Sequence, residues 1–247
     1  MKNILTFTIA VLTAGLMNAQ LAGEIATNMG VGATTTAGAI ATIDGALGSA
    51  RAKKGDYDSS EFSGSPYVNN SFLPTSLYYK DEKIGSLFYR HNALNEEVEI
   101  MKANVEGELI RSLARDKELN IRVNGKKMSF KTFITVKKRT TNGYLTQLLD
   151  GKEYDLYKRT LVKFTEGTPA QNSFVAAVPA RFTQFTEYYY QKEGVNRIDE
   201  VVAKNTKLLK LLDDDVKAKT KAFLKANDLN IKNEADMVKA FEFLNEN

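Results

Sequence analysis

Cysteine and tryptophan are absent from the 247-residue chain, and histidine occurs once, as His91. The missing cysteine excludes disulfide bonds, thiolate metal sites, cysteine nucleophiles and a lipidated N-terminal cysteine. Chemistry that needs two histidines cannot be built within one chain. The sequence also lacks G-x-S-x-G, P-loop, H-E-x-x-H and zinc signatures. We therefore expect no catalytic residues of these classes, no metal site and no cofactor.

A strong excess of charge of one sign is also missing. The 34 Lys and Arg residues stand against 30 Asp and Glu, which gives a formal net charge of +4. So small an excess over the whole chain is not typical of a dedicated nucleic-acid-binding protein. Hydrophobic residues make up 43% and charged residues 26%, as in ordinary globular proteins. These values predict a folded protein without a nucleic-acid partner.

The N-terminus has the three parts of an export signal. Lys2 supplies a positive charge, residues 4–17 are uncharged and mostly apolar, and Ala19 is a small residue at a cleavage end. A buried helix or a membrane anchor is the alternative, but the apolar run is short for a span, which needs ~20 apolar residues. We expect residues 1–19 to be a signal peptide.

Residues 20–63 read as a leader and linker. Residues 21–50 contain six Gly, eight Ala and five Thr, which gives too little side-chain volume for a core. Ile40, Ile43 and Leu47 fall at helical spacing, so a short helix is one expectation here. The segment is interpreted as a flexible or weakly helical leader, with self-association as the alternative.

Residues 64–197 alternate with the period of strands. The strongest short hairpin signal is Asn124-Gly125, which follows a strand pattern with apolar residues at Leu119, Ile121 and Val123. The expected return strand carries one apolar face, formed by Met128, Phe130, Ile134 and Val136. Further turns are expected in four places: Lys80–Lys83, Asn142-Gly143, Asp150-Gly151 and the loop between Pro169 and Pro179.

From about Ile198 the apolar period changes to that of helices. Asp213–Asp215 suit the start of one helix and Asn233 the N-cap of the next, whose buried face would carry Met237, Ala240, Phe241 and Leu244. The predicted fold class is therefore α+β: an antiparallel β-meander or sandwich-like domain followed by a small helical unit at residues 198–247. The pattern leaves open whether this unit docks on the sheet.

One strand is unusually aromatic. Within residues 181–191, five aromatic side chains form the predicted partner or ligand surface: Phe182, Phe185, Tyr188, Tyr189 and Tyr190. Successive strand residues point to opposite faces, so one face would be core and the other could present aromatic surface, which suits protein, peptide or carbohydrate contact. Packing within the sheet is the alternative, since aromatic residues favour strands.

Three polar residues are weaker candidates. His91 lies at the end of a predicted strand, where a catalytic base would need a partner that the sequence does not supply at a recognisable spacing. Glu97 and Glu99 share a strand face ~7 Å apart along the strand, as a carboxylate pair for glycoside chemistry would require. The solvated faces of most antiparallel strands carry such pairs, so this interpretation is preferred and we expect both glutamates to point outward.

Several segments resemble a group of exported Bacteroidota proteins of unassigned function. The resemblance rests on residues 64–69 with Phe72, on residues 90–92 and 95–99, and on residues 207–209, 221–227 and 234–238 of the tail. The Asn-Ala-Gln signal ending fits the same lineage. The resemblance covers residues 64–247, brings no catalytic residues, and implies an envelope protein of a Gram-negative cell.

Together these observations predict a non-enzymatic exported protein that binds a protein or another envelope component. We expect it in the periplasm or associated peripherally with the outer membrane, rather than outside the cell. A hydrolase acting on envelope polymers is one alternative, and a structural subunit that self-associates through residues 21–50 is another. The oligomeric state does not follow from the sequence.

Overall fold

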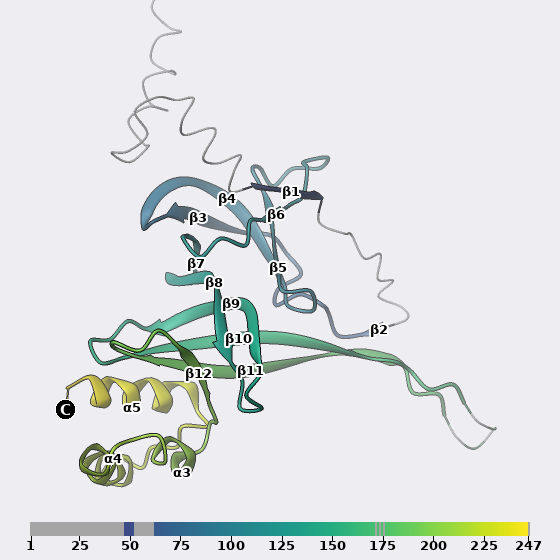
Figure 1. The fold of residues 1–247 in the computed structure, drawn as a ribbon. Coiled ribbons are helices and arrows are strands. Elements are labelled where there is room, and N and C mark those ends of the chain that lie inside the picture. The colour runs from purple at the N-terminus through teal and green to yellow at the C-terminus, as the bar shows by residue number, and fades with distance from the viewer. Residues whose placement is uncertain (1–46, 52–61, 171, 173, 175, 247) are drawn as a thin grey trace, which may run out of the picture.

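The computed structural model describes the backbone of residues 47–51 and all of residues 62–170, 172, 174 and 176–246. Within these ranges the fold is α+β, dominated by one large sheet with helices at the C-terminal end (Figure 1). The strands are β1 (Leu47–Arg51), β2 (Phe62–Ser63), β3 (Leu73–Tyr79), β4 (Glu82–Asn92), β5 (Glu97–Met101), β6 (Arg111–Leu113), β7 (Leu119–Val123), β8 (Lys126–Ile134), β9 (Thr140–Leu149), β10 (Tyr154–Thr165), β11 (Ala180–Lys192) and β12 (Ile198–Val201). The helices are α3 (Asn205–Leu208), α4 (Asp214–Ala226) and α5 (Glu234–Glu246).

The sheet folds back on itself at one end. Its strand order is β1-β6-β5-β4-β3-β7-β8-β12-β11-β10-β9, and β8 also pairs with β9. Strands β8, β12, β11, β10 and β9 therefore close a ring, while the remaining strands continue as a curved open sheet. Most neighbours are antiparallel, as expected, but β12 lies parallel to β8 and β2 lies parallel to β11.

Strand β8 serves two hydrophobic cores. Met128, near its start, packs in the core of the open sheet with Leu77, Val98 and Ile121. Phe133, near its end, packs in the ring with Leu145, Tyr157, Tyr189 and Ile198. The expected continuous apolar face through Ile134 and Val136 is wrong because the strand changes partners: Phe133 points into the ring and Val136 is 49% exposed.

The hairpin predicted at Asn124-Gly125 is confirmed. Val123 pairs with Lys126 and Ile121 with Met128, and both turn residues have positive φ, 51° and 79°, as a two-residue turn of this kind requires. The β3–β4 hairpin is confirmed as well, with its turn at Lys80 and Asp81.

The turn predicted at Asn142-Gly143 is wrong. Both residues lie inside β9, where Asn142 pairs with Thr132 and Gly143 with Lys131. The chain reverses instead at residues 135–139, where the Thr135 N–H donates to the Arg139 carbonyl and Lys138 takes a φ of 59°. Gly143 instead leaves room for the Glu96 carboxylate.

The C-terminal unit begins later than predicted and docks on the sheet. Residues 198–201 are strand β12, because they fill the gap between β11 and β8. The helices after them pack against Leu156 and Val201 of the ring through Met237, Ala240, Phe241 and Leu244, the buried face that the sequence predicted. Asn233 caps α5 as expected, accepting from the Ala235 N–H at 2.8 Å.

The C-terminal end of this unit is fixed to the sheet by a side chain of α5. The Asn245 Oδ1 accepts from the backbone N–H groups of Glu153 and Tyr154, both at 2.8 Å, and its Nδ2 donates to the Tyr154 carbonyl. The α5 helix thereby closes the β9–β10 turn and is fixed to the ring.

The predicted signal peptide lies outside the described residues, as does the leader up to residue 46. Within the leader's last part, Leu47–Arg51 pairs with β6 as a strand, so the helical expectation for Leu47 is wrong. Phe62 and Ser63, at the end of the predicted linker, also join the sheet through β11.

A candidate partner-binding arm

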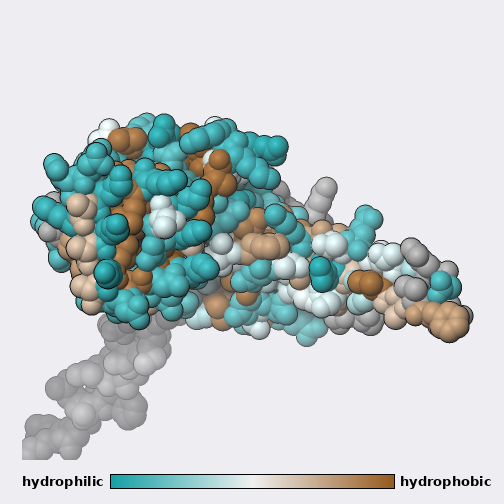
Figure 2. Space-filling model, turned by 90° about the horizontal axis from the view of Figure 1, so that it is seen from below, coloured by the Kyte–Doolittle hydropathy of each residue, from teal (hydrophilic) through white to brown (hydrophobic). Residues whose placement is uncertain are grey.

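Strands β10 and β11 run on together past the ring and project from the body. Their pairing is continuous from Tyr154–Lys192 to Thr165–Arg181, but β9 accompanies β10 only as far as Lys158 and β12 accompanies β11 only at Tyr188–Gln191. The part beyond, residues 159–187, is called the arm. It extends from the body as a narrow ribbon (Figures 1 and 2).

An ion-pair network holds the base of the arm. The Arg159 guanidinium binds the Glu96 carboxylate at 2.5 Å and the Glu187 carboxylate at 2.9 Å, and the Tyr189 hydroxyl donates to Glu187 at 2.7 Å. Arg159 also lies over the Phe133 ring, 5.1 Å from its centroid. Burial raises the pKa of the Glu96 carboxyl above its ordinary value, and Arg159 opposes that rise. Since both arm strands contribute to the network, it fixes the direction in which the arm leaves the ring.

Gly143 makes room for this network. A Cβ atom at this position would lie 2.8 Å from Glu96 Oε2, and that oxygen also accepts from the Tyr144 N–H at 3.2 Å. Glu96 itself sits in a turn with a φ of 52°. The glycine therefore lets the β4–β5 turn of the open sheet lie directly on β9 of the ring.

A second contact holds the arm further out. The Val162 N–H donates to the Ala93 carbonyl at 3.0 Å, and Val162, Phe182 and Ala93 form a small buried cluster. The rings of Phe62, Phe164 and Phe182 lie 5.1–5.8 Å apart by centroid. This stretch of the arm is thus a supported element, which lowers the entropy that binding through it would cost.

Large hydrophobic side chains are exposed both along the arm and in its end loop. Phe174, in the loop between the strands, is 95% exposed, and Val178, Phe185 and Phe164 are 55%, 42% and 40% exposed. In the space-filling view the end of the arm is hydrophobic (Figure 2). Residues 167–180 contain no charged residue. An aromatic side chain this exposed, on a loop that projects from the body, is a candidate for contact with another molecule.

The predicted aromatic surface is divided by the structure. Tyr189 is fully buried in the ring. Tyr188 and Tyr190, on the opposite face, pack under the helical unit, and the Tyr188 hydroxyl donates to Glu234. Phe182 is buried at the arm's second contact, and Phe185 alone of the five is exposed. A strongly exposed aromatic side chain, Phe174, lies further along the same hairpin. Sequence reasoning missed it because an isolated Phe in a loop has no periodicity.

The polar candidates do not converge. Arg90 pairs with Glu99 and Asn92 with Glu97 across β4 and β5, whereas His91 pairs with Val98, so His91 lies on the opposite face from both glutamates. The expectation that Glu99 points to solvent is wrong. It is 1% exposed and binds Arg90 at 2.5 Å, because the Arg90 guanidinium, stacked on Tyr67 and Phe72, covers it. Glu97 is half-buried.

His91 is enclosed in the core. It is 5% exposed, its ring lies 6.0 Å from that of Tyr144, and none of the described residues forms a hydrogen bond with its Nε2. Burial, with a smaller contribution from Arg159, lowers the pKa of His91 from 6.5 to about 4.

We predict that His91 stays neutral at pH values well below 6.5, the ordinary pKa of histidine. Its pKa is lower in the folded chain than in the unfolded chain, so the folded state binds fewer protons and loses stability as the pH falls through 6.5 toward 4. The loss should reach about 1 kcal/mol between pH ~7 and pH ~5.5. His91 is the sole histidine, so one imidazole resonance in an NMR titration reports it directly. A midpoint near 6.5 would contradict its burial.

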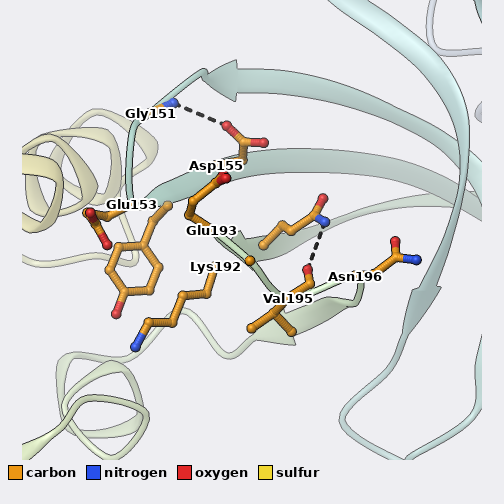
Figure 3. Close-up of a pocket in the computed structure, with 10 residues that line it drawn as sticks. Gly151, Glu153, Asp155, Lys192, Glu193, Val195 and Asn196 are labelled. Carbon is orange, nitrogen blue, oxygen red and sulfur yellow. Dashed lines mark hydrogen bonds between the residues drawn. The ribbon is translucent and has the colours of Figure 1, made fainter.

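A hollow lies at the opposite end of the same two strands (Figure 3). It has a volume of about 300 Å³ and is lined by the β9–β10 and β11–β12 turns. Its polar groups bind one another: Asp155 accepts from the Gly151 N–H, and Gln191 donates to the Val195 carbonyl. The Glu153 and Asp155 side chains point in different directions (Figure 3). This arrangement does not gather side chains around a reacting group.

The described ranges hold neither a metal-binding cluster nor a membrane-spanning helix. There, no group of three or more His, Asp or Glu side chains is placed to hold a metal ion. Among the helices that the structure describes, none is long and apolar enough to cross a membrane. No family model, curated protein or solved structure matches the chain.

Proposed function

We propose that this is a non-enzymatic exported protein of the cell envelope that binds a protein or another envelope component through the arm. The observation that carries the proposal is the exposure of Phe174, 95%, on a hairpin whose base is fixed by Arg159. An exposed hydrophobic group on a supported projection loses apolar surface to water when a partner covers it, and little ordering is needed.

The export signal and the resemblance to exported Bacteroidota proteins support the envelope as the place of action. The periplasm or the inner face of the outer membrane is the proposed location. The position of His91 supports a binding role over catalysis, because His91 is buried and faces away from Glu97 and Glu99.

Site-specific crosslinking tests the proposal. The chain has no cysteine, so Ala176→Cys, beside Phe174, places one thiol at the end of the arm for a photo-crosslinker. In intact cells we expect a discrete crosslinked product. Adding Phe174→Ser should reduce its yield about tenfold or more, because burying a Phe side chain is worth about 1.5–3 kcal/mol.

The matched control is Lys221→Cys, on the exposed face of α4. It should give no product of the same mass. Equal products from both positions, or a yield unaffected by Phe174→Ser, would show that the arm is not the binding element.

A further inference from the structure

One segment of the sheet is rich in cations and contains no acid. From Leu119 to Leu149 the sequence has seven Lys and Arg residues and no Asp or Glu. The first four contact neighbouring groups of the fold: Arg122 lies over Tyr78, Lys126 donates to the Leu148 carbonyl, Lys127 binds Asp81, and Lys131 lies over Tyr157. The other three, Lys137, Lys138 and Arg139, are exposed in the β8–β9 turn. Across the described ranges, no ion pair involves any of these three.

Two further cations come to this turn from a distant part of the chain. Strand β12 runs parallel to β8, with Asp199 beside Ile134, and the Val136 N–H donates to the Glu200 carboxylate at 2.8 Å. Glu200 therefore lies beside the β8–β9 turn, and the chain leaves β12 next to this turn. The residues that follow lead directly into α3, where Lys204 and Lys207 are exposed. The β8–β9 turn and the segment entering α3 both lie on the helical side of the ring (Figure 1).

Two exposed apolar side chains belong to the same two segments. Val136 is 49% exposed and Val202 is 40% exposed. Of the two acids on β12, Asp199 forms an ion pair with Arg197 at 2.6 Å, and Glu200 accepts a hydrogen bond from the neutral Val136 N–H. The surface thus combines exposed aliphatic groups with cations for which the described part of the chain supplies no ion pair. We call it the basic patch: Val136, Lys137, Lys138, Arg139, Val202, Lys204 and Lys207.

We propose that the basic patch binds the surface of an anionic phospholipid bilayer. Lipid phosphates would neutralise the five cations, and each cation near such a surface strengthens binding about fivefold. Val136 and Val202 favour a bilayer over a soluble polyanion as the ligand. Their side chains can be buried at the boundary between headgroups and acyl chains, whereas they add nothing to the binding of a free phosphate. This site is separate from the arm, since the two share no residue.

Co-sedimentation of the purified protein with vesicles tests this assignment. We expect binding to vesicles of phosphatidylcholine and phosphatidylglycerol in equal parts and little binding to pure phosphatidylcholine. The variant Lys137→Gln/Lys138→Asn/Arg139→Gln should bind the anionic vesicles about 100-fold more weakly. Asn is chosen at position 138 because it tolerates the positive φ of that residue.

The control removes the same charge elsewhere: Lys83→Gln/Lys117→Gln/Lys152→Gln, all at exposed positions, should leave binding nearly unchanged. Val202→Ser should weaken binding to vesicles but leave binding to inorganic polyphosphate unaltered. An equal loss in both triple variants would overturn the proposal, since net charge alone would then explain binding. Tighter binding to polyphosphate than to vesicles would overturn it as well, as would an absence of vesicle binding.

Discussion

Arg159→Met should lower the free energy of unfolding by about 3 kcal/mol, because it leaves the Glu96 and Glu187 carboxylates without their cation in a largely enclosed site. The exposed fractions of the three side chains, 11%, 17% and 27%, leave some water access, so the loss should stay near the lower end of the range for broken buried pairs. Urea denaturation followed by circular dichroism measures this quantity.

The control for Arg159→Met is Lys163→Met, on the same strand and the same face but exposed. It should change stability by less than about 0.5 kcal/mol. Adding Glu96→Gln to Arg159→Met should restore part of the loss, because one unpaired charge is removed. Equal stability of Arg159→Met and the natural chain would show that the network does not fix the base of the arm.

Phe241→Ala should be more costly, about 4 kcal/mol, which is typical of deleting a buried Phe side chain. Phe241 is 1% exposed and its ring lies 6.3 Å from those of Tyr154 and Tyr190 in the sheet. Because the helical unit docks on the ring, the whole chain should unfold earlier in one transition. Glu242→Ala, exposed on the same helix, is the control and should have little effect. A separate early transition of the helices alone would contradict docking.

Local patterns predicted the parts of the fold that local interactions determine. Asn124-Gly125 gave a turn and a register together, since a two-residue turn fixes which residues face each other. The caps and the buried face of α5 followed from helical spacing and from Asn233. The α+β class followed from the change of period near residue 198.

The errors arose where a distant residue decides the local structure. Gly143 looked like a turn residue, but it is a strand glycine that accommodates the Glu96 carboxylate. Glu99 looked solvated, but Arg90 and the segment around Tyr67 cover it. Residues 198–201 were expected to be helical, but they form a strand that pairs with both β11 and β8 and completes the ring. The spacing of nearby residues in the sequence indicates none of these contacts.

The candidate site shows the same division. The sequence identified the aromatic strand, and the structure divides its side chains between the ring, the helical unit and the arm. Only the closure of the ring determines where β10 and β11 lose their neighbours. The arm, and the exposure of Phe174 on it, therefore required the three-dimensional pairing.

The most direct test of arm-mediated binding is the size of the protein's complex in mildly solubilised envelopes, measured on native gels. The natural chain and Lys221→Ser should migrate together in a species larger than the 27.5 kDa chain. Phe174→Ser should migrate as the free chain. Identical migration of all three, whether large or small, would contradict a partner held by the arm.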